Sequence, residues 1–427
     1  MTKFDLADMA RLRQSGTRVG IVSICTAHPL AIEAALLQAR DHRAQALIEA
    51  TCNQVNQDGG YTGMTPADFK SFVFDIAGRI DFNPGDVILG GDHLGPNPWR
   101  TLPAEEAMAK AEAMIAAYAA TGFFKLHLDT SMGCQGEPLA LPDDLTASRA
   151  ARLAAAAERA ARDAGLPPPV YVIGTEVPVP GGALHALDHL HVTRPEAALA
   201  TVEVHRRAFA DAGLTDAFTR AVGVVVQPGV EFADADVIAY APAAARALAA
   251  TLDRMPHFVF EAHSTDYQPA AALRALVDDG FAILKVGPAL TFAMREAFYG
   301  LDQVAQTIAP DETIPSLRDS MELLMVAEPG HWQPYYGEHG TALVTQRHFS
   351  YSDRIRYYWP HPKARAAVDA MMGRLGDGAI PETLVSQFLP RLLTGLRDGS
   401  IGPTARDLMI ASIRVALEPY SAACAAD

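Results

Sequence analysis

The stretch Val222-Gly223-Val224-Val225-Val226 is a continuous apolar run, and the polar residues Gln227-Pro228-Gly229 follow it directly. A strand that is apolar at every position is typical of a parallel sheet covered on both faces, because an exposed face would bring polar residues into alternation. Seven more strand-like runs recur along the chain, at residues 20–25, 46–50, 87–90, 123–128, 170–174, 258–261 and 282–286. The pattern therefore predicts eight buried, parallel strands.

A stretch with helical periodicity follows each of these runs. We expect helices at residues 29–39, 65–80, 103–120, 145–164, 195–212, 242–252, 269–277 and 290–303. Eight strand–helix units in this order predict an α/β fold, a (β/α)8 TIM barrel that covers residues 1–304 together with a short N-terminal helix. The alternative is an open doubly wound sheet, which usually has a glycine-rich dinucleotide loop after its first strand. The sequence at that place is Cys25-Thr26-Ala27-His28-Pro29.

The strand pattern stops near residue 305. Helical stretches follow at residues 315–327, 363–375, 381–393 and 404–417, and an aromatic, basic patch at residues 351–359 lies between the first two. We therefore expect residues 305–427 to form a helical C-terminal extension. Its contact with the barrel is expected to use Tyr357, Tyr358 and Trp359.

The composition is that of a globular protein with a large core. Of the 427 residues, 49% are apolar and 20% are charged. A net charge of −15 repels nucleic acid and anionic lipid, so we expect neither as a partner. No run approaches the ~20 apolar residues of a membrane span, and the first 14 residues lack the apolar core of a signal peptide. The four cysteines are too scattered for a disulfide framework, and we expect a cytoplasmic protein.

In a barrel of this kind the active site is built at the carboxyl ends of the strands. Every predicted strand of this chain ends in polar residues, which is more than core packing requires. These residues include His28, Glu49, Asn53, Asp92, His93, Asn97, Lys125, His127, Asp129, Ser131, Glu176, Gln227, Glu261, His263, Ser264 and Lys285. We interpret this ring as a ligand site, and the alternative is a hydrated barrel mouth that survives from an inactive relative.

Asp92 directly precedes His93 at the end of the third predicted strand. Taken alone, His93 and His263 are equally well explained as buried histidines with satisfied nitrogens. A turn at a strand end lets an adjacent Asp and His face one pocket, where the carboxylate can take a proton beside a metal-bound imidazole. Lys125 and Lys285 lie inside apolar strands and need carboxylate partners. Schiff-base chemistry through one of these lysines is the alternative to the metal route.

Two kinds of candidate exist for a phosphate site. The turns Gly181-Gly182 and Gly287-Pro288 are candidate cradles for phosphate, through their backbone N–H groups. Arg354 and Arg356 are better candidates, because a guanidinium group binds phosphate bidentately. The alternative for the arginines is an arginine–aromatic patch that stabilises the extension.

Several long motifs resemble those of one known family. They are Gly90-Gly91-Asp92-His93-Leu94-Gly95-Pro96-Asn97, Glu261-Ala262-His263-Ser264-Thr265-Asp266-Tyr267-Gln268, and residues 23–29, 49–57, 59–64, 174–182, 227–232 and 352–360. In them the chain resembles the accessory, so-called non-catalytic, subunits of D-tagatose-1,6-bisphosphate aldolase. That family is also labelled tagatose 6-phosphate kinase, and some of its members are associated with C4 epimerisation of D-tagatose 6-phosphate.

A wider similarity to class II aldolase barrels implies roles for single residues. Asp92 would be the acid–base group, and His93 and His263 would bind a divalent metal, Zn²⁺, Mn²⁺, Co²⁺ or Ni²⁺. Gln227, a weaker ligand, stands where a third histidine is expected, and Glu176 would complete the metal site. The other expected site residues are Glu49, Asp129 and Glu176 for catalysis, and His28, Asn53, Asn97, Lys125, Ser131, Gln227, Ser264, Lys285, Arg354 and Arg356 for substrate binding.

The resemblance implies three functions. The first is a metal-dependent C4 epimerase of tagatose catabolism that converts D-tagatose 6-phosphate to D-fructose 6-phosphate by retro-aldol and aldol steps. The second is an accessory subunit that stabilises a separate class II aldolase, which the loss of a histidine at Gln227 favours. The third is a kinase, which needs a phosphate loop, and the sequence has no G-x-x-x-x-G-K-[ST] motif. A homo-oligomer is expected in each case.

Overall fold

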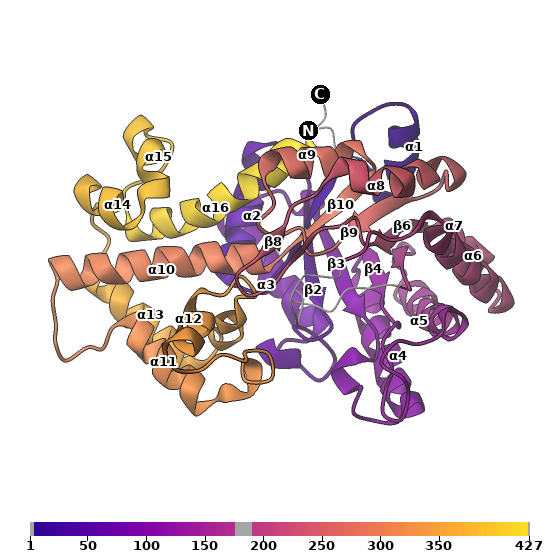
Figure 1. The fold of residues 1–427 in the computed structure, drawn as a ribbon, viewed down its shortest axis with the longest axis horizontal. Coiled ribbons are helices and arrows are strands. Elements are labelled where there is room, and N and C mark those ends of the chain that lie inside the picture. Colours follow the sequence, from indigo (N-terminus) through magenta and orange to yellow (C-terminus); the bar gives the residue numbers. More distant parts are fainter. Residues whose placement is uncertain (1–3, 176–189, 426–427) are drawn as a thin grey trace.

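Eight parallel strands close into a barrel in the computed structural model, which describes residues 4–175 and 190–425 (Figure 1). Around the barrel the order is β1-β10-β9-β6-β5-β4-β3-β2. The strands are β1 (Ile21–Cys25), β2 (Ala46–Thr51), β3 (Val87–Leu94), β4 (Lys125–Leu128), β5 (Val170–Ile173), β6 (Ala221–Val226), β9 (Val259–Ala262) and β10 (Phe281–Val286). The predicted (β/α)8 barrel is confirmed, and the open sheet is excluded because β1 pairs with both β2 and β10.

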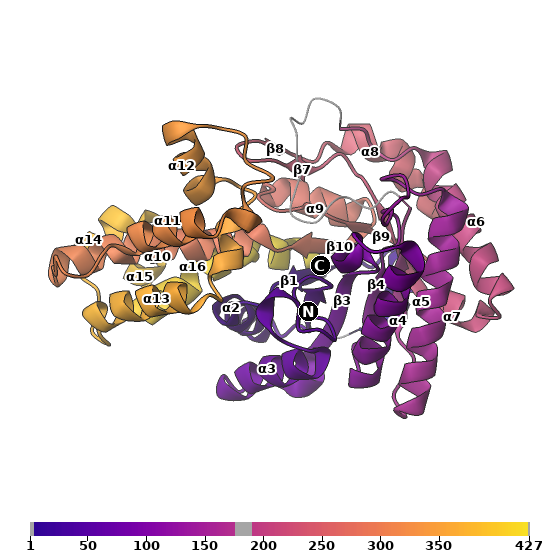
Figure 2. The ribbon, with the colours of Figure 1, turned by 90° about the horizontal axis from the view of Figure 1, so that it is seen from below.

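Helices surround the strands, and Figure 2 shows α4 to α7 outside one side of the barrel. They are α1 (Met9–Gln14), α2 (Pro29–Asp41), α3 (Pro66–Arg79), α4 (Ala104–Thr121), α5 (Asp143–Asp163), α6 (Pro195–Asp211), α7 (Thr215–Thr219), α8 (Pro242–Ala249), α9 (Ala270–Asp278) and α10 (Pro288–Ile308). Five of them begin with proline, which lacks an N–H group that the first turn would leave unpaired. In the described part of the chain, no helix has the length and apolar character needed to cross a membrane.

The barrel interior is divided into an apolar floor and a charged layer above it. Ile21, Leu47, Val172, Val259 and Ile283 belong to one buried apolar cluster at the floor. Side chains on a strand alternate between faces, so the inward positions two residues further along belong to the next layer up. That layer holds Ser23, Glu49, Glu261 and Lys285, all of them buried. Within the continuous apolar runs, every second residue therefore points into the barrel, and these inward positions lead from the floor to the mouth at the carboxyl ends of the strands.

Six further helices follow α10, and Figure 1 shows α11 to α15 to one side of the barrel. They are α11 (Leu317–Ala327), α12 (Gly340–Phe349), α13 (Pro362–Leu375), α14 (Glu382–Phe388), α15 (Leu393–Asp398) and α16 (Ala405–Cys424). The last of them, α16, returns to the barrel and packs against α2, α9, α10 and β1. The approach is close, since a Cβ atom on Gly20 would lie 3.0 Å from Sγ of Cys424.

Two side chains of the aromatic patch make contacts of the expected kind. Trp359 is buried against Phe298, with ring centroids 5.2 Å apart, and Tyr357 meets the edge of Tyr61 at 5.1 Å. Tyr358 instead donates a hydrogen bond to the carbonyl oxygen of Glu328, which lies within the extension itself. Because α10 continues across residue 304, the division of the chain at that point stays a prediction.

Three differences from the prediction have simple causes. The helix expected at 381–393 is interrupted, because Pro390 cannot donate a backbone hydrogen bond and begins a short 3-10 turn after α14. In contrast, α16 continues to Cys424 with Pro419 inside it. The short elements α7, α12, α15, β7 (Glu231–Phe232) and β8 (Val237–Ile238) were not predicted, since so few residues give little periodicity.

Candidate active site

Two lysines and two glutamates form a buried ionic network in the charged layer of the barrel. Lys125 Nζ lies 2.7 Å from both Glu49 Oε1 and Glu261 Oε2. Lys285 Nζ lies 2.8 Å from Glu49 Oε2 and 3.4 Å from Glu261 Oε1. Gly90 lies between β2 and β4 at this level, and a Cβ atom there would be 2.5 Å from Glu49 Oε1. The expected carboxylate partners of both lysines are therefore present, and glycine provides the space for one of them.

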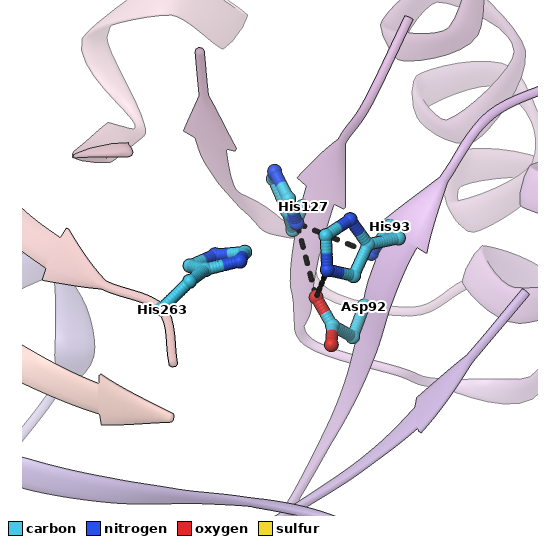
Figure 3. A group of neighbouring side chains, drawn as sticks. All are labelled: Asp92, His93, His127 and His263. Atoms are coloured by element: carbon cyan, nitrogen blue, oxygen red, sulfur yellow. Dashed lines mark hydrogen bonds and ion pairs between the residues drawn. The ribbon is translucent and has the colours of Figure 1, made fainter. Parts of the chain in front are cut away.

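Above this network, three histidines and one aspartate meet at the mouth of the barrel (Figure 3). The ring centroids of His93, His127 and His263 are 4.9 to 5.1 Å apart. Asp92 Oδ1 lies 3.0 Å from His127 Nδ1 and 3.8 Å from His93 Nε2, and it contacts Lys285 Nζ. Each of the four residues offers one ligand atom, and these atoms lie within 4.8 Å of one another. The expected convergence of His93 and His263 is observed.

The backbone at His93 explains how adjacent residues reach one pocket. Asp92 and His93 both belong to β3, where successive side chains would point to opposite faces. His93 has a φ angle of 49°, in the left-handed region that non-glycine residues rarely adopt. This turn brings the His93 ring to the same side as the Asp92 carboxylate. Such a conformation costs of the order of 1–3 kcal/mol and is typical of functional sites.

Hydrogen bonds to neighbouring carboxylates fix the orientation of two histidines of the cluster. His93 Nδ1 lies 2.7 Å from Asp129 Oδ2, and Ser131 donates to the other oxygen of Asp129 at 2.9 Å. His263 Nε2 lies 2.8 Å from Glu261 Oε1, which links the histidines to the ionic network below. Imidazoles that bind metals are usually oriented by a carboxylate at their second nitrogen. Asp129 and Glu261 lie in that position relative to His93 and His263.

The charges of the cluster follow from burial and from its neighbours. Burial lowers the pKa of His263 to about 3 and lowers the pKa of His127 below its usual value, so both rings are neutral at pH 7. Burial alone would raise the pKa of Asp92, but His93 and Lys285 hold it well below its usual range. Two neutral imidazoles beside a carboxylate are ready to bind a divalent cation without first losing a proton.

The residues present fit a metal ion. Three imidazoles and a carboxylate are a donor set that suits Zn²⁺, Mn²⁺, Co²⁺ or Ni²⁺. His127 Nε2 is buried and has no hydrogen-bond partner among the described residues. Buried imidazole nitrogens are normally satisfied, and a cation bound to this ring would supply a partner.

A cavity of about 90 Å³ opens at this mouth. Seven of the residues expected from the sequence line it, namely Asn53, Asp92, His93, His263, Ser264, Lys285 and Arg356. Glu49 and Lys125 lie in the layer beneath the mouth, and Asp129 and Ser131 lie behind His93. None of these four residues lines the cavity.

The remaining expected residues are placed elsewhere or lie outside the described part. Gln227 Oε1 accepts hydrogen bonds from the N–H groups of Gly229 and Val230, so this side chain stabilises the loop that follows it. Arg354 donates to the carbonyl oxygen of His331 and stacks on Tyr335. It lines neither the cavity at the mouth nor a second cavity of about 270 Å³ beside it. Asn97 begins a short 3-10 turn. His28 caps α2 with Nδ1 and lines the second cavity, which adjoins the mouth. Glu176, Gly181 and Gly182 lie outside the described residues.

His127 was included among the polar strand-end residues, but no role of its own was predicted for it from the sequence. It lies on β4 between Lys125 and Asp129, which directly follows the strand, and the three share one face by alternation. The available signal for His127 was therefore its position two residues after the buried Lys125 on the same strand. Tyr61, which lines the mouth from a loop after β2, had no comparable signal.

Asp266 allows a test of the electrostatics of this region. Its Oδ1 accepts hydrogen bonds from the N–H groups of Gly287, at 3.0 Å, and Ala289, at 2.8 Å, and burial raises its pKa to about 6. A carboxyl group whose pKa is raised on folding destabilises the fold when the pH is above its pKa in the folded protein. This penalty is lost as the pH falls toward the pKa of the group in the unfolded chain. Asp266→Asn keeps the acceptor oxygen and removes the charge. We expect the free energy of unfolding to rise by about 3 kcal/mol at pH 8 and by only about 1 kcal/mol at pH 4.5.

Urea denaturation at the two pH values measures this difference. An increase of equal size at both pH values would contradict the assignment, because it would arise from something other than the charge. A decrease at pH 8 would show that the carboxylate stabilises the N-terminus of α10 more than burial disfavours it.

The fold and the mouth together define a barrel enzyme with ionisable groups at its strand ends. The chain belongs to the family described as "D-tagatose-1,6-bisphosphate aldolase subunit GatZ/KbaZ-like", whose model matches residues 6–425. A protein from Agrobacterium fabrum named D-tagatose 6-phosphate 4-epimerase is 51% identical over 418 residues, which are 98% of this chain and 98% of that protein. A solved structure from Sinorhizobium meliloti, described as a probable tagatose 6 phosphate kinase, has 60% identity and a TM-score of 0.89, covering 95% of this chain and 100% of that one.

These comparisons confirm the family resemblance seen in the motifs. A relative that is 51% identical over nearly the whole of both chains is named an epimerase, and this chain is accordingly identified as an enzyme.

Proposed function

We propose that this protein converts D-tagatose 6-phosphate to D-fructose 6-phosphate by inverting carbon C4. The name of the relative from Agrobacterium fabrum supports the substrate. The observation that carries the proposal is the Asp92 carboxylate beside three imidazoles at a barrel mouth. A proton acceptor and a cation site at one place are what an aldol-type inversion requires. A cytoplasmic location and a homo-oligomeric state are part of the same proposal.

In this proposal His93, His127 and His263 hold the divalent metal, and Glu176 is a further ligand. The bound metal supplies Lewis-acid polarisation of the C2 carbonyl and the C3 hydroxyl of the sugar. Asp129 and Glu261 orient His93 and His263 through their second ring nitrogens. The side chains of the chain itself carry the remaining steps.

Asp92 accepts the proton from the C4 hydroxyl oxygen. The C3–C4 bond then breaks, its electron pair remains on the C1–C3 fragment, and C4 becomes an aldehyde carbon. The aldehyde turns over, the C3–C4 bond forms again on its other face, and a proton returns to the C4 oxygen. Lys285 keeps Asp92 in its carboxylate form, and Glu49 fixes Lys285 from below. No atom is gained or lost, as an epimerisation requires.

The accessory role is the second candidate function, and the description of the family as an aldolase subunit favours it. It requires a surface that binds a catalytic aldolase and does not require turnover. The kinase function has less support, because the chain lacks a phosphate-loop motif and its histidine cluster offers no cradle for a triphosphate.

The direct test is an assay of the purified protein, stripped of metal and then supplied with Mn²⁺, Co²⁺, Ni²⁺ or Zn²⁺. We expect D-tagatose 6-phosphate to be converted to D-fructose 6-phosphate with at least one of these ions, and chelation to abolish the conversion. No turnover with any ion, together with increased activity of an added aldolase subunit, would establish the accessory role instead. Transfer of phosphate from ATP to the sugar would establish the kinase.

A further inference from the structure

A second cavity of about 270 Å³ adjoins the mouth of the barrel. The two cavities share five lining residues, Cys25, Gln54, Tyr61, Gly287 and Arg356. The second cavity extends from there between the start of α2 and the segment beyond the barrel, where Trp359 and Arg365 line it. The two spaces are therefore neighbours with a common wall.

The mouth alone is small for the proposed substrate. Sites for small molecules usually measure about 300–1,000 Å³, whereas the mouth has about 90 Å³. The second cavity brings the combined space into that range. A six-carbon sugar phosphate that places its reacting carbons at the histidines must therefore extend past Arg356.

Arg356 is a partly buried cation without an ion-pair partner among the described residues. Its Nη1 donates to the carbonyl oxygens of Ser352 and Asp353, and its Nη2 donates to the hydroxyl group of Tyr357 at 2.9 Å. All three acceptors are neutral. The nearby carboxylate of Asp353 is paired with Arg295 at 3.1 Å. A charge removed from water is costly unless it is paired, so this guanidinium group is suited to an anionic ligand.

The place where many barrels bind phosphate is already filled in this chain. That place is the backbone after the last strands, at the N-terminus of the following helix. Here the Asp266 carboxylate accepts hydrogen bonds from the N–H groups of Gly287 and Ala289 at the start of α10. The Gly287-Pro288 turn is thus not free to cradle a phosphate, and the anion must bind elsewhere.

The second cavity contains a further donor in need of an acceptor. Trp359 is only 3% exposed, and its indole N–H has no hydrogen-bond partner among the described residues. Arg365 lines the same cavity; its side chain is exposed, and its guanidinium group donates to the carbonyl oxygen of Pro360. A buried donor without an acceptor and a second guanidinium group around one space favour a ligand that is rich in acceptors.

We propose that the second cavity is the phosphate subsite of the enzyme, with Arg356 gripping the phosphate group and Trp359 and Arg365 beside it. The proposal rests on the function proposed above. The C4 aldehyde fragment carries the phosphate, so a fixed phosphate lets the aldehyde turn over while the fragment stays bound. The subsite also selects phosphorylated ketoses over free ones.

The test compares Arg356→Lys with Arg354→Lys. Both residues lie in the same short 3-10 helix and both variants keep the positive charge, but only Arg356 lines the cavities. Binding of D-fructose 6-phosphate and of D-fructose is measured by calorimetry, apart from any turnover. We expect Arg356→Lys to weaken binding of the phosphate ester about 10- to 100-fold and to leave D-fructose unchanged. Arg354→Lys is expected to match the parent protein for both ligands.

The outcomes separate this proposal from the proposed function. Equal affinity of the Arg356→Lys variant and the parent protein for D-fructose 6-phosphate would overturn the subsite. If the parent protein binds the ester but has no epimerase activity, and Arg356→Lys binds the ester more weakly, the subsite is supported and the epimerase is refuted. Should Arg356→Lys fail to fold, Trp359→Phe removes the unpartnered N–H but keeps most of the ring, and unchanged affinity for the ester would then overturn the subsite.

Discussion

Asp92→Asn is expected to lower the rate of C4 epimerisation by about 10²- to 10⁴-fold, the usual contribution of a general base. Asparagine keeps the size and one acceptor oxygen of the carboxylate, so the contact with His127 can persist. It cannot accept the proton from the C4 hydroxyl group. Lys285 retains Glu49 and Glu261 as partners, which limits any loss of stability. The measurement is kcat with saturating metal and D-tagatose 6-phosphate.

Asp302→Asn is the matched control. Asp302 is also a buried carboxylate, 2% exposed, but it accepts a hydrogen bond from the N–H group of Leu317 on α11, away from the mouth. We expect this variant to turn over at the rate of the parent protein. If Asp92→Asn also turns over at the parent rate, Asp92 is not the base and the proposed proton transfer is wrong.

His127→Ala is expected to remove both bound metal and activity. Loss of a carboxylate that only orients a ligand typically lowers metal affinity 10- to 100-fold, and loss of a ligand itself is expected to cost more than about 100-fold. The metal content of the folded, purified variant provides a direct readout. It is independent of the assay, and circular dichroism shows whether the variant is folded.

His205→Ala controls for the loss of a buried imidazole. His205 on α6 also has a buried Nε2 without a hydrogen-bond partner in the described chain, and its pKa is lowered to about 4 by burial. It belongs to no group of metal-binding side chains in that part of the chain. We expect His205→Ala to lose stability and to keep its metal. Full metal content in His127→Ala would show that His127 is not a ligand.

The fold was predictable because its signal is long and repeated. Eight apolar runs, each followed by a helical stretch, leave few architectures, and the Asp92–His93 pair marked the mouth. The site was less predictable, because an inward position is not distinguishable from an outward one in a run that is apolar on both faces. Lys125 stands out in the sequence as a charged residue inside an apolar strand. His127 lies two positions later on the same face, but an uncharged histidine does not differ from its neighbours in this way.

Other features depend on contacts that are distant in the chain. Gln227 precedes its own loop, and only the fold shows that Oε1 is taken up by Gly229 and Val230. Arg354 and Arg356 are equivalent in the sequence, yet only one of them lines the mouth, because the 3-10 helix turns the other toward His331. The sequence also did not predict that α16 would return to the first strand.

The return of α16 has a consequence for how the protein folds during its synthesis. The side chains of Glu33 on α2 and Arg406 on α16 form a hydrogen bond although they are 373 residues apart in the chain. The ribosome therefore releases β1 and α2 long before the helix that covers them exists. Domains tend to fold from the N-terminus as they emerge, and uncovered apolar surface invites aggregation. The surface beside the first strand of the nascent barrel therefore stays uncovered until α16 has been synthesised.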